Sequence, residues 1–151
     1  MRWENMAMPR KNILIVEDEI FVALELEQIV ESAGYAAVDI AADSESALAL
    51  AEYCDIALVD LNLRDGPTGP QIGEALARDH GVRVIYVTAN PSQIGAAAAN
   101  ALGFIAKPFQ PATVRAALDI AASDPPPPVM AEQIRGFTPL MLSAGSSPSL
   151  E

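Results

Sequence analysis

The sequence predicts an α/β protein in which an open, doubly wound sheet of five parallel strands carries helices on both faces. Short apolar runs recur along the chain, each closed by turn or helix signals, which is typical of strands buried on both faces. Between these runs, apolar residues recur at helical spacing, so strands and helices alternate as in a (βα)5 chain. The strands are expected at residues 12–17, 36–41, 55–60, 82–88 and 103–106.

Helices are expected between these strands. Val22, Leu26, Ile29 and Ala33 form one apolar stripe, and Gly34 ends that helix. The residues expected for the other helices are 45–53 with Ser44 as N-cap, 69–79 with Thr68 as N-cap, 93–101 with Ser92 as N-cap, and a last helix with the stripe Val114, Ala117, Leu118 and Ala121. The helix over 93–101 is rich in alanine and is expected to pack loosely, because alanine offers little area for burial.

Charge and cysteine content exclude several classes of function. A formal net charge of -11 over 151 residues argues against binding to nucleic acid or to an anionic membrane surface. Cys54 is the only cysteine, which excludes an intrachain disulfide and a paired-cysteine metal site. The sequence contains neither a secretory apolar segment nor a run near the roughly 20 apolar residues that cross a bilayer. A cytoplasmic protein is therefore predicted.

The composition divides the chain into three parts. Residues 1–10 are predicted to be an N-terminal extension, 11–122 the folded domain, and 123–151 a proline-rich linker and apolar tail with no effector domain. Pro125 to Pro128 cannot continue a helix, and the stretch after them is too short for a second domain. The tail is too apolar to be purely solvated, which favours its docking on another surface; its apolar residues include Met130, Ile134, Phe137, Leu140, Met141 and Leu142.

Polar residues stand where four of the predicted strands end. Glu17 and Asp18 follow the first strand, Asp60 closes the third, Thr88 closes the fourth, and Lys107 follows the fifth. The carboxyl ends of parallel strands meet at one edge of a sheet, so these side chains should converge. Three carboxylates repel one another unless a cation neutralises them, and oxygen ligands without His or Cys favour Mg²⁺. Asp60 can then attack a phosphoryl group whose oxygens Lys107 and Thr88 hold.

The segments LIVEDE, ALVDLNL, YVTAN and AKPF, in this order and spacing, resemble response-regulator receiver domains over roughly residues 11–122. The resemblance implies a flavodoxin-like fold with strand order 2-1-3-4-5. It also implies that Asp60 is the phosphoacceptor and that Asp18 is a metal ligand. Glu17, where aspartate is commoner, becomes an acid of the metal shell, and Asn62 becomes a ligand through its backbone carbonyl.

The same resemblance assigns roles around the fifth strand. Thr88 and Lys107 become a conformational pair, and Phe104 takes the place of the switch aromatic without a hydroxyl group. The Lys107–Pro108 bond is expected to be cis. The segments EDEIFVALELE and KPFQPATV are similar to receivers of alphaproteobacterial general-stress-response regulators and to the single-domain regulators that accompany their sensor kinases.

The function predicted from these residues is that of a single-domain response regulator in a two-component phosphorelay. It would accept a phosphoryl group from a sensor histidine kinase or a histidine phosphotransferase and act as a switch or a phosphate sink. It would catalyse only its own phosphorylation and dephosphorylation. Asn62 and Asn90 lie two residues beyond Asp60 and Thr88, and Ala89 leaves room beside the site, so these three residues are predicted to tune dephosphorylation.

Other interpretations of the same residues remain open at this point. Taken singly, Asp18 could cap a helix, Lys107 could be an exposed lysine, Thr88 a turn residue and Phe104 a core residue. An aspartate-nucleophile phosphatase is a second class, although it would require an Asp-x-Asp pair after the first strand. A third class is a phosphorylation-independent module that forms a homodimer through its last helices or its tail.

Overall fold

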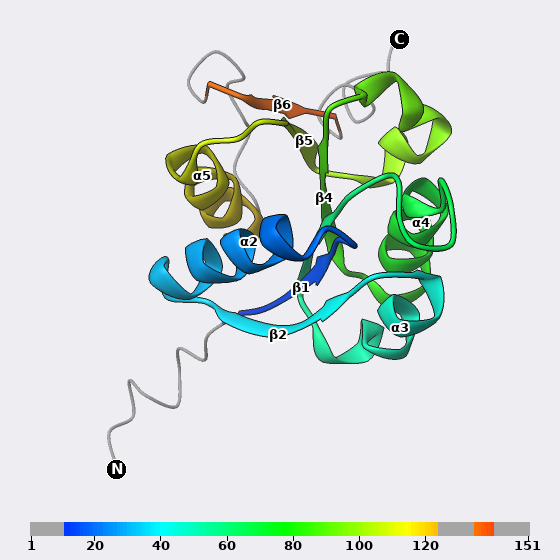
Figure 1. Ribbon diagram of the computed structural model, residues 1–151, viewed down its shortest axis with the longest axis horizontal. Helices are drawn as coiled ribbons and strands as arrows, with labels where there is room; N and C mark the ends of the chain where they lie inside the picture. The colour runs from blue at the N-terminus through cyan, green and yellow to red at the C-terminus, as the bar shows by residue number, and fades with distance from the viewer. Residues whose placement is uncertain (1–10, 124–134, 141–151) are drawn as a thin grey trace, which may run out of the picture.

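The computed structural model describes residues 11–123 and 135–140, which build one sheet between two helical layers (Figure 1). The strands follow the order β2-β1-β3-β4-β5-β6, and all pairs up to β5 are parallel. The predicted parallel sheet with order 2-1-3-4-5 is therefore confirmed. The strands are β1 (Asn12–Val16), β2 (Ala36–Ala41), β3 (Ile56–Val59), β4 (Arg83–Thr88), β5 (Gly103–Ala106) and β6 (Phe137–Pro139).

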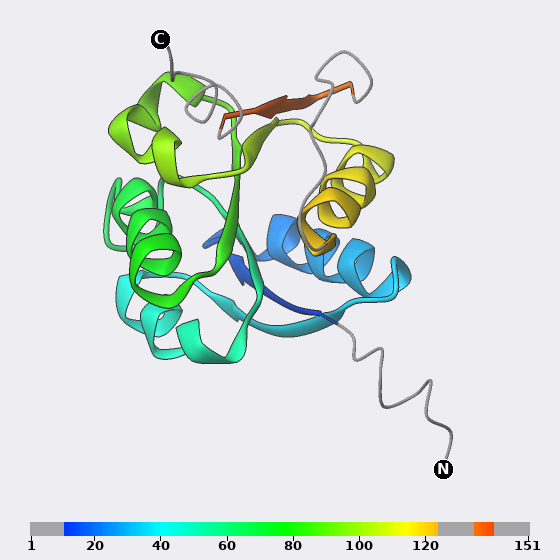
Figure 2. The same cartoon turned by 180° about the vertical axis from the view of Figure 1, so that it is seen from behind.

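Helices cover both faces of the sheet, as Figures 1 and 2 show from opposite sides. The α-helices are α2 (Ile20–Ser32), α3 (Ser44–Ala49), α4 (Gly69–His80) and α5 (Pro111–Ala122), and the 3₁₀ helices are η1 (Ala51–Tyr53), η2 (Pro91–Gln93) and η3 (Gly95–Asn100). One layer holds α2 and α5, and the other holds α3, α4 and η3. None of the helices within the described ranges is long and apolar enough to cross a membrane.

The central strands are buried on both faces because they separate two apolar cores. Along β1, Ile13 and Ile15 pack towards α2 and α5, whereas Leu14 and Val16 pack towards α3 and α4. Side chains alternate along a strand, so an unbroken apolar run is what a strand between two helical layers requires. The predicted stripe of α5 is also confirmed, since all four of its residues are fully buried.

Two helices differ from the prediction at their ends or faces. The helix predicted over 45–53 ends as an α-helix at Ala49 and continues as η1. Its N-cap is Asp43, not Ser44, because the Asp43 carboxylate accepts a hydrogen bond from the Ser46 amide at 3.0 Å. In α2 the core face also includes Ala23 and Val30, which the predicted stripe omitted.

The helix predicted over 93–101 with Ser92 as N-cap is wrong. This segment forms the two 3₁₀ helices η2 and η3, and neither has a side-chain cap. Gly95 has a φ of 60° and breaks the α-helical path between them. Ile94 and Ala97 are buried and three residues apart, which is the spacing that a 3₁₀ helix places on one side.

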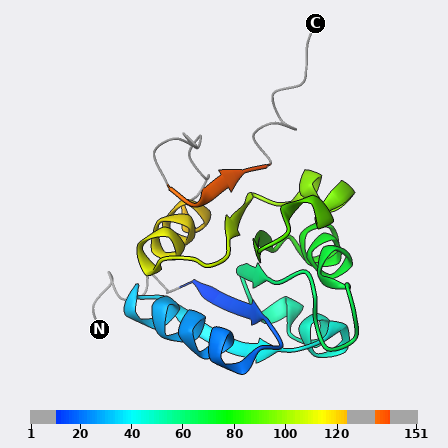
Figure 3. The same cartoon turned by 45° about the horizontal axis from the view of Figure 1, so that its top comes forward.

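A further strand lies inside the segment predicted as a tail. Phe137 to Pro139 pair with β5 in the antiparallel direction and extend the sheet to six strands (Figure 3). The buried Phe137 joins the α2 and α5 layer, and Leu140 packs against the other layer. The predicted docking of Phe137 and Leu140 is confirmed. The other apolar residues of the predicted tail and the extension 1–10 lie outside the described residues; they are Met130, Ile134, Met141 and Leu142.

Gly73 provides a test of the packing between α4 and the sheet. A Cβ atom at Gly73 would lie 2.2 Å from the hydroxyl oxygen of Tyr86, which is fully buried. Glycine to alanine in a helix normally gains about 1 kcal/mol, but overpacking a core costs about 1–3 kcal/mol. We expect Gly73→Ala to lower the free energy of unfolding in a denaturant titration. The exposed Gln71→Ala in the same helix should change it by less than about 0.5 kcal/mol, and a more stable Gly73→Ala would contradict the close packing.

Candidate functional site

A polar cavity of about 350 Å³ opens at the carboxyl edge of the parallel strands. It lies where β1, β3, β4 and β5 end, which is where open parallel sheets bind their ligands. Eight of the residues predicted for the site share this region, seven in the lining and Glu17 buried behind it. The lining residues are Asp18, Glu19, Asp60, Asn62, Leu63, Thr88, Ala89, Asn90 and Lys107.

Three carboxylates converge at this cavity. Carboxylate oxygens of Glu17, Asp18 and Asp60 all lie within 4.8 Å of one another. The strands set this spacing: the Glu17 amide donates to Ala41 at 2.8 Å, and the Asp60 amide donates to Val16 at 2.9 Å. Such a group of oxygen ligands suits a hard divalent cation such as Mg²⁺.

Lys107 compensates the negative charge of two of these acids. Its Nζ lies 3.1 Å from Glu17 Oε1 and 3.4 Å from Asp60 Oδ2, so one ammonium group links the ends of β1, β3 and β5. Burial raises the pKa of Glu17, the charge of Asp60 adds to the rise, and the Glu19 amide and Lys107 oppose it. Burial alone would lower the pKa of Lys107, but Glu17 and Asp60 outweigh it and raise that pKa.

Thr88 and Lys107 are connected through the backbone as well as through the cavity. The Lys107 amide donates to the Thr88 carbonyl at 3.0 Å. The Thr88 hydroxyl oxygen accepts a hydrogen bond from the Asn90 amide at 2.8 Å, which turns the chain so that Ala89 and Asn90 line the cavity. Thr88 is therefore both a turn residue and a cavity residue.

The structure shows where the residues with alternative interpretations lie. Asp18 does not cap α2, because the N-cap position is Glu19, and no side chain caps that helix. Lys107 is not a free surface lysine, since it makes two ion pairs. Phe104 packs against the core and does not line the cavity. The Lys107–Pro108 bond is cis, as expected.

Three residues that the sequence analysis did not single out also belong to the site. Glu19 and Leu63 line the cavity, and Gln93 accepts a hydrogen bond from the Asn62 side chain at 3.1 Å. Glu19 could have been anticipated, because it follows the acid pair directly. Gln93 could not, because it is 31 residues from Asn62 and no motif connects the two.

A doubly wound sheet whose strand ends gather acids, a threonine and a lysine defines the class of CheY-like signalling domains. The chain belongs to the response regulator receiver domain family, whose model matches residues 13–119. This confirms the predicted resemblance and indicates a signalling domain instead of a conventional enzyme.

Known proteins with the same domain include a stress regulator and a chemotaxis protein. The chain is 35% identical over 113 residues to the phyllosphere-induced regulator PhyR of Methylorubrum extorquens, with 72% of this chain and 42% of that protein covered. It is 32% identical to the chemotaxis protein CheY of Thermotoga maritima, with 72% of this chain and 95% of that protein covered. The chain thus spans less than half the length of that PhyR.

Among solved structures, the receiver domain of Erythrobacter litoralis PhyR matches with a TM-score of 0.69 and 32% identity, over 76% of this chain and 92% of that one. PhyR of Brucella abortus matches with a TM-score of 0.65 and 32% identity, over 74% of this chain and 47% of that one. The domain is therefore similar to the receiver of the general-stress-response regulator PhyR.

Removal of the lysine charge tests the electrostatics of this site. Lys107→Met keeps an apolar stem but leaves Glu17 and Asp60 without their ammonium partner. We expect the variant to be less stable than the wild type in chelator, because unpaired buried charge is costly, and to gain more stability from Mg²⁺. Thermal unfolding with and without Mg²⁺ measures both effects. Asp60→Asn is the matched control and should gain less than the wild type; equal gains in all three proteins would contradict the account.

Proposed function

We propose that the domain is a phosphorylation switch or phosphate sink of a cytoplasmic two-component phosphorelay, with Asp60 as the phosphoacceptor. The observation that carries this proposal is the convergence of Glu17, Asp18 and Asp60 within 4.8 Å, with the Lys107 ammonium 3.4 Å from Asp60. The phosphodonor would be the histidine of a sensor kinase or of a histidine phosphotransferase. Membership of the receiver family supports such a donor.

The side chains suit nucleophilic attack by a carboxylate. One Asp60 oxygen would form the bond to phosphorus while the bond from phosphorus to the donor nitrogen breaks, leaving a neutral histidine after proton uptake. The other oxygen, Asp60 Oδ1, is fixed in position because it accepts a hydrogen bond from the Leu61 amide at 2.8 Å. Lys107 would exchange Glu17 for an oxygen of the phosphoryl group, and the Thr88 hydroxyl would donate to another.

The acidic residues fit Mg²⁺ as the cofactor. Glu17, Asp18, Asp60 and the backbone carbonyl of Asn62 would hold it, with no nitrogen or sulfur ligand in the set. When bound, the ion would neutralise the negative charge of the phosphoryl oxygens. Among the chain's own residues, Lys107 offsets the charge of two of these acids, Glu17 and Asp60.

Phosphorylation by a small donor tests the assignment of Asp60. Acetyl phosphate with Mg²⁺ should add the mass of one phosphoryl group to the wild type, and Asp60→Asn should remain unmodified because an amide is not a comparable nucleophile. Intact-protein mass spectrometry measures both. Asp65→Asn, an exposed acid beyond the lining, is the matched control and should be modified like the wild type. An unmodified wild type, beside a control receiver that is modified, would refute the proposal.

The proposal includes self-catalysed dephosphorylation, with Asn62, Ala89 and Asn90 tuning its rate. These residues line the cavity beside Asp60, and the small Ala89 leaves access for water. After removal of the donor, the phosphorylated mass should decay faster with Mg²⁺ than with chelator. Persistence of the phosphorylated protein for days with Mg²⁺ would contradict this part of the proposal.

The surface beside the cavity suggests where a histidine donor would dock. Ile20, Phe21 and Leu24, in the first turns of α2, are 56%, 84% and 46% exposed and begin one residue after the acid pair, next to the cavity residue Glu19. Exposed apolar side chains beside a reactive centre are typical of a protein contact. We include this patch in the proposal as the docking surface of the phosphodonor protein.

Comparison of two donors tests the docking surface. The two donors are a histidine kinase that phosphorylates the wild type and acetyl phosphate. Phe21→Ala should lower the rate with the kinase, relative to the rate with acetyl phosphate, by about 10-fold or 1.4 kcal/mol. Tyr53→Ala is the matched control, because Tyr53 is also an exposed aromatic, at 59%, but lies before β3 at the other end of the sheet. An unchanged ratio for Phe21→Ala would remove the patch from the proposal.

A further inference from the structure

The edge of β5 is occupied by a short segment that is hydrogen-bonded to the domain at both of its ends. The Ala106 amide donates to the Gly136 carbonyl at 3.1 Å, and the Leu140 amide donates to the Leu102 carbonyl at 3.0 Å. Thr113 at the start of α5 donates its hydroxyl to the Arg135 carbonyl at 2.8 Å. Residues 135–140 thus lie along the whole edge of β5, as Figure 3 shows.

A slot in β5 receives the aromatic side chain of this segment. Phe137 is 3% exposed, and a Cβ atom at Gly103 would lie 2.5 Å from its ring. Only glycine at position 103 leaves this space. The slot therefore selects a strand that carries an aromatic residue at this place.

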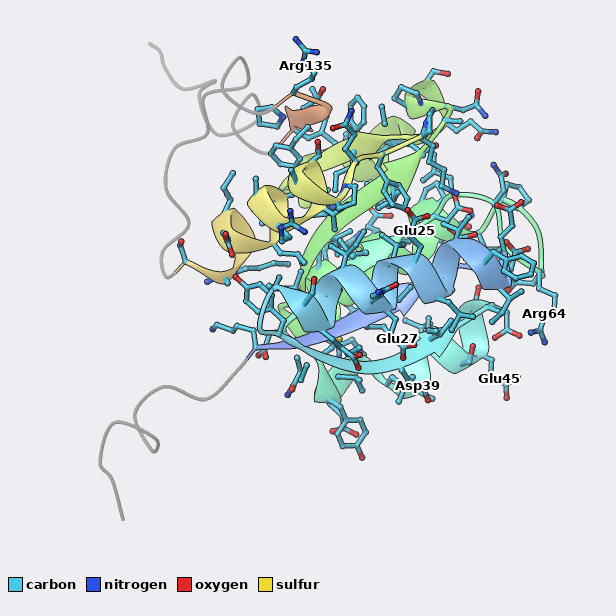
Figure 4. All side chains as sticks on the ribbon, turned by 60° about the vertical axis from the view of Figure 1, so that its left-hand side comes forward. Glu25, Glu27, Asp39, Glu45, Arg64 and Arg135 are labelled. Atoms are coloured by element: carbon cyan, nitrogen blue, oxygen red, sulfur yellow. The ribbon has the colours of Figure 1, made fainter. Side chains whose placement is uncertain are left out.

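The segment leaves a neighbouring cavity unfilled. The space is about 400 Å³. Arg135 and Gly136 of the segment form one side of it, and the loop after β5 and the first turns of α5 form the other. Gly136 has a φ of 90°, which turns the chain aside at this point, and the exposed Arg135 side chain extends away from the domain (Figure 4). An extended strand would instead place its residue at position 135 on the same side as Phe137.

We propose that the β5 edge is a binding groove for an extended segment of a partner protein, and that β6 is its intramolecular occupant. The partner segment would carry an apolar residue, any residue and then an aromatic residue. The apolar residue would pack against the wall that remains when β6 leaves, which is formed by the loop after β5 and the first turns of α5, and the aromatic residue would fill the slot at Gly103. Backbone pairing with β5 supplies the remaining contacts, as in other cases of strand addition. The β6 strand pairs through three residues only and includes Pro139, which has no amide to donate, so a longer segment can displace it.

Three synthetic hexapeptides test the groove on the full chain. The first has the sequence of residues 135–140, the second carries Arg135→Leu and Gly136→Val, and the third adds Phe137→Ala to the second. We expect the second to bind at least about 10-fold more tightly than the first, and the third not to bind at about 1 mM, in fluorescence anisotropy. Phe137→Ala in the protein should tighten binding of the second peptide by about 10-fold, because it weakens the competing strand. The exposed Thr138→Ala is the matched control and should not change it.

Other outcomes would overturn the proposal. The groove would be excluded if the second peptide bound neither the wild type nor the Phe137→Ala and Thr138→Ala variants. Equal binding of the second and third peptides would also exclude it. If Phe137→Ala prevents folding, or if the Leu140 amide of the wild type exchanges hydrogen only as slowly as the amides of β3, then β6 is a fixed part of the fold and not a replaceable occupant. If the wild type forms a dimer that Phe137→Ala abolishes, and no peptide binds, the occupant of the groove is the β6 strand of a second copy.

Discussion

The structure depends on the balance of charge at the carboxyl edge of the sheet. Glu17 and Asp60 are buried acids on neighbouring strands, and the Lys107 ammonium reaches both of them. Buried charges are tolerated only when they are paired, so the ends of β1, β3 and β5 cannot shift independently of one another. β4 takes part through its backbone, because the Thr88 carbonyl accepts the Lys107 amide. The sheet positions these side chains, and their ion pairs in turn restrict the relative positions of the strand ends.

Much of the fold and site could be predicted from the sequence because both depend on strong local patterns. Five apolar runs predicted the parallel strands, and the polar residues after them predicted the convergence of acids with Lys107. Because the carboxyl ends of parallel strands lie at one edge of the sheet, the convergence of these polar residues follows from the strand prediction. Even the cis bond before Pro108 agreed with the family resemblance.

The rest depended on contacts that a linear pattern does not show. The segment around Gly95 has the composition of an α-helix. Its buried side chains are Ile94, Ala97 and Ala101, and the segment forms a 3₁₀ helix instead. β6 has three residues and contains a proline, so no alternating pattern marks it as a strand. Its position is set by the space above Gly103, which is visible only when the sheet is assembled.

The position of β6 in the chain has a consequence for biosynthesis. During translation β5 and α5 leave the ribosome well before Phe137, so the sheet can assemble while the edge of β5 still has unpaired amides and carbonyls and an empty slot at Gly103. Open strand edges on nascent chains are sites of aggregation, and the interval lasts until Phe137 to Pro139 have also left the ribosome and paired with β5. The covering of this edge by Phe137 is therefore a late event in the maturation of each molecule, and until it occurs the newly made domain presents an unpaired strand to its neighbours.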